Sequence, residues 1–222
     1  MRYENICPAV FVRRNNRFTA QVLLKQEEIT VHVKNTGRLG ELLLPGAQVI
    51  LTKSGNPNRK TAYDLVGAYR GEKLYNIDSQ APNAVVYEWL QTRGFDEIRP
   101  ETTYGASRID FWMRRGSETY LLEVKGCTLE EGGVGYFPDA PTERGVRHLG
   151  ELARAAGEGI HAGLAFVICM KGVEQVLPND RTQPAFGQAL ARAKQAGVAV
   201  WFLQTDPKPD ALFVTGAEQD NS

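Results

Sequence analysis

Short runs of alternating apolar and polar residues fill the first third of the chain. Each run ends at a polar or glycine-containing turn, which is the pattern of antiparallel strands. Five strands are predicted, over residues 8–14, 18–24, 29–33, 48–53 and 63–69. Short antiparallel strands at this spacing indicate an OB-like β-barrel.

The pattern changes near residue 78. Residues 83–92 carry apolar side chains at helical spacing, and 98–103 is a predicted strand. Later segments alternate between nearly all-apolar strands and helices, as in a sheet that is covered on both faces. We therefore expect an OB-like barrel over 1–78, an α/β domain over 79–215 and a disordered tail over 216–222.

A β-hairpin with its turn at or beside Gly116 is predicted in the middle of the second domain. A turn at 116–117, of type II′ because glycine comes first, puts Asp110 opposite Glu123. A turn one residue earlier leaves the two residues on a diagonal. Because side chains alternate along a strand, Asp110, Glu123 and Lys125 share one face in either register.

This combination of side chains has a chemical logic. Two neighbouring carboxylates repel each other unless a cation lies between them, and Mg²⁺ binds through one or two carboxylates together with substrate phosphate. A lysine two residues along can hold an attacking water and stabilise charge on phosphorus. The spacing of Asp110, Glu123 and Lys125 resembles the PD-(D/E)xK nuclease signature. A solvated hairpin face with a surface salt bridge is the alternative.

Two segments follow the hairpin. The glycine-rich segment 128–138 is expected to be a mobile flap. A helix is predicted after Pro141, with Arg144, Arg147 and His148 at spacings of three and four residues on one face. This cationic face is suited to a phosphate group, and a solvated face paired with Glu151 is the alternative.

Charge is unevenly distributed along a chain of zero net charge. Residues 1–78 hold twelve Lys and Arg against seven Asp and Glu, and residues 79–222 hold fourteen against nineteen. A basic barrel suggests a polyanionic partner. The candidate phosphate contacts, each with a plain solubilising role as the alternative, are Arg13, Arg14, Arg38, Asn56, Arg59 and Lys60.

Cysteine usage and hydropathy predict a cytoplasmic protein with no membrane span. The three cysteines are widely spaced and form neither a disulfide framework nor a zinc site. The first residues lack the apolar core of a signal peptide, and no apolar run approaches the ~20 residues that a membrane helix needs.

With these motifs in place, the chain resembles the sugar fermentation stimulation protein A (SfsA) family from about residue 8 to residue 214. The resemblance implies an OB-like N-terminal domain, a C-terminal PD-(D/E)xK restriction-endonuclease-like α/β domain, and DNA binding linked to sugar-utilisation genes. The blocks that carry the resemblance occur in the expected order, at 35–38, 56–60, 107–111, 123–125 and 137–149.

The resemblance also implies residue roles. Asp110 and Glu123 match the metal-binding acids, Lys125 matches the catalytic lysine, and Glu88 falls where the superfamily often has a helical acid. The Val124 carbonyl is a further candidate metal ligand. Gly126 departs from the family pattern, which tends to have asparagine there.

The leading hypothesis is a nuclease that depends on Mg²⁺ or Mn²⁺ and acts on DNA, with RNA as an alternative substrate and a homodimer as an open assembly state. The rival hypothesis is a non-catalytic DNA-binding regulator of sugar-utilisation (maltose-type) genes that retains a nuclease fold, since a fold does not fix a function.

Overall fold

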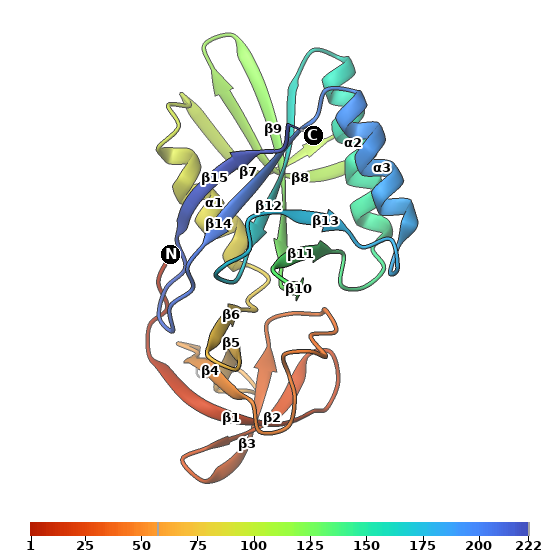
Figure 1. Ribbon diagram of the computed structural model, residues 1–222. Coiled ribbons are helices and arrows are strands. Elements are labelled where there is room, and N and C mark those ends of the chain that lie inside the picture. Colours follow the sequence, from red (N-terminus) through yellow and green to blue (C-terminus); the bar gives the residue numbers. More distant parts are fainter. Residues whose placement is uncertain (57, 222) are drawn as a thin grey trace.

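The computed structural model describes residues 1–56 and 58–221, which form a β-barrel domain followed by an α/β domain (Figure 1). In the barrel, β3 pairs with β5 and so closes a five-stranded sheet, to which β6 is added. The pattern did not predict β6, because four residues are too few to show an alternation. The strands are β1 (Ile6–Arg14), β2 (Thr19–Leu24), β3 (Glu27–Val33), β4 (Gln48–Lys53), β5 (Tyr63–Arg70) and β6 (Lys73–Asn76).

A six-stranded sheet of order β15-β14-β12-β9-β8-β7 forms the centre of the second domain. The inner strands β9, β12 and β14 are parallel, and the other neighbours are antiparallel. Its strands are β7 (Glu97–Tyr104), β8 (Ser107–Arg115), β9 (Glu118–Cys127), β12 (His161–Ile168), β14 (Ala199–Thr205) and β15 (Val214–Gln219).

Helices cover both faces of this sheet. Helix α1 (Ala81–Gln91) lies on one face, and α2 (Glu143–Gly157) and α3 (Pro184–Gln195) lie on the other (Figure 1). Strand β9 contributes alternately to the two apolar clusters: Leu121 packs with the residues under α2 and α3, and Leu122 packs with those under α1. Burial on both faces is the reason that the inner strands read as continuous apolar runs.

Two segments differ from the prediction. Residues 216–219 of the expected disordered tail belong to β15, which pairs with β14 because that strand would otherwise leave an open edge. The expected flap is an ordered hairpin of β10 (Leu129–Glu131) and β11 (Val134–Phe137). Strand β11 pairs in parallel with β13 (Val176–Pro178), and this pairing holds the hairpin against the domain.

The two domains meet at a buried carboxylate. Glu130 of β10 accepts hydrogen bonds from Arg70 and from the Tyr75 hydroxyl of the barrel, the latter at 2.9 Å. Its other oxygen accepts the Gly133 backbone N–H at 2.8 Å. The ion pair between Arg70 and Glu130, in which the Glu130 side chain is 7% exposed, joins the barrel to the sheet of β10, β11 and β13.

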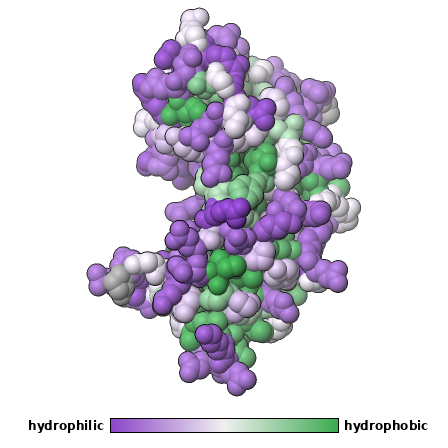
Figure 2. Space-filling view, turned by 90° about the vertical axis from the view of Figure 1, so that its left-hand side faces the viewer, coloured by the Kyte–Doolittle hydropathy of each residue, from purple (hydrophilic) through white to green (hydrophobic). Residues whose placement is uncertain are grey.

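Hydrophilic residues cover most of the surface seen in Figure 2, with hydrophobic residues gathered in separate patches between them. In the described part of the chain, no helix is both long enough and apolar enough to cross a membrane.

Candidate metal and phosphate site

Strands β8 and β9 separate at the residues that the sequence singled out. Their ladder runs from Arg115↔Glu118 to Phe111↔Leu122, which is the register of a turn at 116–117. Gly116 has a φ of 58°, which glycine adopts without strain. Past this ladder, Asp110 Oδ2 accepts the Val124 backbone N–H at 2.8 Å, so a side chain replaces the neighbouring strand.

Helix α1 supplies the second contact of Asp110. The Asn83 side-chain amide donates to Asp110 Oδ1 at 2.9 Å. Both carboxylate oxygens are therefore held in place by donors from two different elements, and each oxygen keeps a lone pair for a further contact.

Glu123 lies at the centre of a second set of contacts. Its Oε1 atom accepts from Lys125 Nζ at 2.5 Å and from Nδ1 of His148 on α2. The Glu123 side chain is only 3% exposed, and its Oε2 atom is buried without a hydrogen-bond partner in the described part of the chain. One oxygen of the buried carboxylate is thus saturated and the other is unpartnered, which is costly unless a further group binds there.

Helix α2 fixes the orientation of His148. Thr142 caps the helix, because its hydroxyl accepts the Gly145 backbone N–H at 2.9 Å. Arg144, one turn before His148, donates from Nε to His148 Nε2 at 3.2 Å. Since Nε2 is then an acceptor, we assign the ring hydrogen to Nδ1, which donates to Glu123.

The pKa values of the two carboxyl groups are shifted in opposite directions. Burial raises the pKa of Asp110, and the nearby Glu123 charge raises it further. Burial also acts to raise the pKa of Glu123, but its hydrogen bond from His148 and the Lys125 charge outweigh this effect and lower the pKa. Glu123 is therefore the firmly ionised member of the pair, and Asp110 is the member that an added cation would help to ionise.

The donor set fits a hard divalent cation. Two carboxylates with an unpartnered buried oxygen are ligands of the kind that Mg²⁺ prefers, with water and substrate oxygens completing its shell. The described residues contain no group of three or more His, Cys, Asp or Glu side chains arranged to hold a metal. A cation bound here would therefore depend on water or substrate for much of its coordination.

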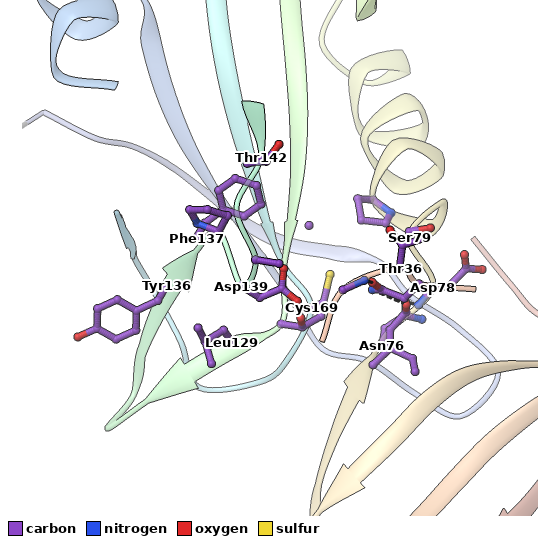
Figure 3. A pocket seen from close by; sticks show the side chains of 18 of the residues that line it. Thr36, Asn76, Asp78, Ser79, Leu129, Tyr136, Phe137, Asp139, Thr142 and Cys169 are labelled. Carbon is purple, nitrogen blue, oxygen red and sulfur yellow. Dashed lines mark hydrogen bonds between the residues drawn. The ribbon is translucent and has the colours of Figure 1, made fainter. Parts of the chain in front are cut away.

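A cleft of about 420 Å³ adjoins these residues where the two domains meet. Pro82 precedes Asn83 in α1, Gly126 follows Lys125 in β9, and Thr142 caps α2, so three elements of the site also line the cleft. In Figure 3, Asp139 lies on one side of the cleft, and Thr36 and Ser79 lie on the other.

Gly126 allows α1 to approach β9 closely. A Cβ atom at this position would lie 2.8 Å from Cγ of Pro82, which is closer than real Cβ contacts. A side chain here would displace the start of α1, and with it Asn83, the partner of Asp110. Glycine at position 126 thus has a structural role in this fold.

Comparison with known proteins covers both domains. A model of the SfsA N-terminal OB domain matches residues 12–77, and a model of the sugar fermentation stimulation protein RE domain matches residues 80–211. The chain belongs to the SfsA family. The OB-like barrel and the α/β domain that the sequence predicted are confirmed by these matches and by the structure.

Individual SfsA relatives match nearly the whole chain. A sugar fermentation stimulation protein homolog of Desulfitobacterium hafniense is 46% identical and covers 97% of both chains. A homolog of the same description from Clostridium perfringens is 50% identical over 90% of this chain and 91% of its own. The solved structure of Pyrococcus furiosus SfsA in complex with Ca²⁺ superposes with a TM-score of 0.88, at 28% identity, over 98% of this chain and 96% of that one.

Among the residues predicted for the site, the SfsA fold brings together Asp110, Glu123, Lys125 and His148. Glu88 does not join their hydrogen bonds. Its carboxylate lies 2.6 Å from the N-terminal amine of Met1. Asn83 contacts Asp110, and Glu88, five residues further along the helix, projects from a different side of it. The Val124 carbonyl stays a predicted ligand.

The predicted cationic face of α2 separates into two kinds of residue. His148 is buried against Glu123, whereas Arg144 and Arg147 are exposed. His148 is thus a partner of the carboxylate, and the two arginines keep the predicted role of phosphate contacts.

Arg14 of the barrel does not have the donors that its predicted role requires. All five of its N–H groups are directed at backbone carbonyl oxygens, and the acceptors are Asn16, Arg17, Asn35, Gly37 and Arg38. The side chain holds two loops together and has no N–H left for phosphate.

The other barrel candidates differ in availability. Arg13 pairs with Glu28 at 3.0 Å on the surface, and Arg59 forms two hydrogen bonds to Asp64, at 2.9 and 2.6 Å. Asn56 accepts the Asn58 backbone N–H through its side chain. Arg38 and Lys60 are exposed, and their side chains form no hydrogen bond in the described part of the chain, so they stay the freest candidates.

Sequence reasoning missed two contributors to the site. Asn83 gives no signal of its own, because an asparagine near the start of a helix is more often a cap than a ligand of an acid on a distant strand. Asp139 lies in a block that carried the family resemblance, and it accepts the Arg38 backbone N–H at 3.2 Å across the domain boundary. Only the packing of the two domains shows this contact.

Proposed function

We propose that this SfsA-family protein is a metal-dependent nuclease that hydrolyses phosphodiester bonds in DNA, with RNA as an alternative substrate. One observation carries the proposal. Asp110 and Glu123 lie close together beside Lys125, and among the described residues Glu123 keeps a buried oxygen without a hydrogen-bond partner. These are the three side-chain types of the PD-(D/E)xK signature, and they lie close enough for the Glu123 charge to raise the pKa of Asp110 and for Lys125 to donate to Glu123.

Asp110 and Glu123 would hold the cation, which when bound neutralises charge on the scissile phosphate and activates water. The residues around them have separate roles. Asn83 and the Val124 N–H orient Asp110, and His148 orients Glu123. Lys125 holds the attacking water and stabilises the charge that develops on phosphorus.

Two further observations support this assignment. Ca²⁺, present in the solved Pyrococcus furiosus relative, takes oxygen ligands as Mg²⁺ does. The exposed Arg144 and Arg147 lie on the helix that carries His148, and they would contact phosphates beside the bond to be cut.

The test uses end-labelled single- and double-stranded DNA and a matched RNA. Wild type, Asp110→Ala and Lys125→Ala are incubated with each polymer in Mg²⁺, Mn²⁺ or EDTA. We expect metal-dependent cutting by the wild type and a loss of at least a hundredfold in both variants. Cutting that survives Lys125→Ala, or that persists in EDTA, contradicts the proposal.

The chain offers a matched control. Asp206 and Lys208 form an ion pair at 2.9 Å with the same spacing as Glu123 and Lys125, but Lys208 is 58% exposed. The variants Asp206→Ala and Lys208→Ala should cut as the wild type does. This comparison separates a contaminating nuclease and a general loss of charge from a loss of the site itself.

A non-catalytic DNA-binding regulator is the second candidate. It is favoured by two contacts that need no cation: Lys125 already neutralises Glu123, and both oxygens of Asp110 accept hydrogen bonds. Retarded but intact nucleic acid in every lane would support this candidate. A steep preference for operator over random DNA would identify its specificity.

A further inference from the structure

A second cavity, of about 430 Å³, lies toward the opposite end of the six-stranded sheet from the cleft. It lies near the beginnings of β9, β12 and β14, where Tyr120, Gly163 and Ala199 contribute to its lining. The cleft instead adjoins Gly126 and Cys169, at the carboxyl ends of β9 and β12. The second cavity opens into the apolar cluster under α1, on the opposite face of β9 from Glu123.

Aromatic side chains form the walls of this cavity. Trp89 and Trp201 meet edge to face with ring centroids 6.3 Å apart, and Phe95 and Tyr120 do so at 5.2 Å. Small residues complete the lining and leave the space open, and they are Ala162, Gly163, Gly197, Ala199 and Ala217. Walls of this kind favour a flat apolar ligand, since aromatic rings prefer offset or edge-to-face partners.

Two arginines lie at the rim, over the faces of wall residues. The Arg93 guanidinium lies 4.6 Å from the Trp89 ring centre, and that of Arg115 lies 4.7 Å from the Phe95 ring centre. Arg115 also donates to backbone carbonyls, whereas Arg93 forms no ion pair in the described part of the chain. Arg93 is therefore the cation that is available to a ligand.

Arginines supply the charge in the lining of the cavity. Its lining, all of it in the described part of the chain, includes no Asp or Glu. Glu118, an acid outside the lining, accepts the Tyr120 hydroxyl at 2.6 Å and lies 3.5 Å from His161. His161 in turn stacks on the Tyr120 ring at 4.5 Å. Glu118 thus adds a negative charge on the His161 side, and Arg93 and Arg115 are the cationic side chains of the lining.

We propose that this cavity binds a small aromatic carboxylate, with its ring between the aromatic walls and its carboxylate on Arg93. The ring is favoured over a nucleobase because the walls offer few polar groups to pair with base edges, and unpaired polar edges are costly to bury. The carboxylate is favoured over a neutral group because a guanidinium forms its strongest hydrogen bonds with anions. The site needs neither metal nor Asp110.

Tryptophan fluorescence gives a direct test, since Trp89 and Trp201 line the cavity and Trp112 does not. The probes are 3-phenylpropanoate, its uncharged analogue 3-phenylpropanol, decanoate and AMP, each titrated into the full chain in EDTA. We expect a saturable change with 3-phenylpropanoate, at an affinity about tenfold above that of the alcohol.

Variants assign the binding to this cavity. Arg93→Gln should weaken 3-phenylpropanoate about tenfold and leave 3-phenylpropanol unchanged. Arg99→Gln is the matched control, because Arg99 lies over the ring of Trp112, outside the cavity, at 4.7 Å. Ala217→Leu should fill the cavity and weaken both probes, with circular dichroism as the check on folding.

Several results would overturn the proposal. One is the absence of saturable binding by 3-phenylpropanoate. A second is an alcohol that binds as tightly as the acid, because the basic rim would then be unused. A third is an unchanged affinity in Arg93→Gln. Tighter binding of decanoate or of AMP would instead make this an acyl-chain or a nucleotide site and would equally contradict the aromatic carboxylate.

Discussion

The carboxylate of Asp110 accepts the backbone N–H of Val124 at 2.8 Å, past the last residue pair of the β8–β9 ladder. The side chain thereby satisfies a donor that the separation of the strands would leave unpaired. The same contact holds Asp110 within the influence of the Glu123 charge. This hydrogen bond thus satisfies a backbone donor of β9 and also positions Asp110 to bind a cation.

Asp110→Asn should stabilise the metal-free protein at neutral pH. Burial and the Glu123 charge raise the pKa of Asp110 in the folded state, so the folded state binds this proton more readily than the unfolded state does. Stability linked to Asp110 therefore rises as pH falls through the raised pKa, and the ionised carboxylate is destabilising above it. Thermal unfolding in EDTA should show a Tm higher by a few degrees at pH 8, with a difference that shrinks at low pH.

Added Mg²⁺ should reverse that order. It should raise the Tm of the wild type, because a ligand that binds only the folded state stabilises it, and it should leave Asp110→Asn unchanged. If Asp110→Asn is less stable than the wild type in EDTA at pH 8, the ionised Asp110 carboxylate does not destabilise the metal-free protein. The site would then be a plain structural cluster.

Glu130→Gln should weaken the contact between the domains. The change leaves Arg70 and Lys73 without their carboxylate, and we expect a loss of about 2 kcal/mol. This is less than the 3–5 kcal/mol of a fully buried pair, because both cations are partly exposed. Urea unfolding measures the loss. Glu131→Gln is the control, since the neighbouring Glu131 pairs with Arg181 on the surface and should change stability by less than about 0.5 kcal/mol.

Arg14→Ala should act on stability, and Arg13→Ala should act on nucleic-acid binding. Arg14 donates its hydrogen bonds to loop carbonyls, so its removal should lower the free energy of unfolding by about 2–3 kcal/mol. Arg13 is 60% exposed, and if it contacts a phosphate, its removal should lower the slope of log affinity against log salt by about one unit. Chemical denaturation and salt-dependent DNA binding measure the two effects. Equal effects on the salt slope would contradict the assignment of Arg14 to the loops.

Gly126→Ala should destabilise the protein by about 1–3 kcal/mol, because the added Cβ would lie 2.8 Å from Pro82. It should also lower metal affinity, since Pro82 precedes the Asn83 that orients Asp110. Gly150→Ala on the exposed side of α2 is the matched control, with no atom within 4 Å of the added Cβ. Better helix propensity should stabilise that variant by about 0.5–1 kcal/mol. Thermal unfolding with and without Mg²⁺ distinguishes the two glycines.

The sequence by itself determined most of the longer strands and the placing of Asp110, Glu123 and Lys125 on one face of a hairpin, and it left two registers of that hairpin open. These features follow from rules that act over a few residues. Side chains alternate along a strand, so the shared face is the same in either register. The structure selected the turn at 116–117, with Gly116 at a φ of 58°. The order of the family motifs was likewise sufficient to predict a barrel followed by an α/β domain.

Only the tertiary structure decided which charged groups are free and which are engaged. Arg13 and Arg14 are neighbours of identical chemistry, yet one is exposed and the other is enclosed by loop carbonyls. Glu88 was expected near the site and instead meets the N-terminal amine, because its position around α1 points it away from Asn83. The physical reason is that hydrogen bonds and ion pairs form between whichever groups the packing of distant segments brings within about 3 Å, and local sequence patterns do not contain that distance.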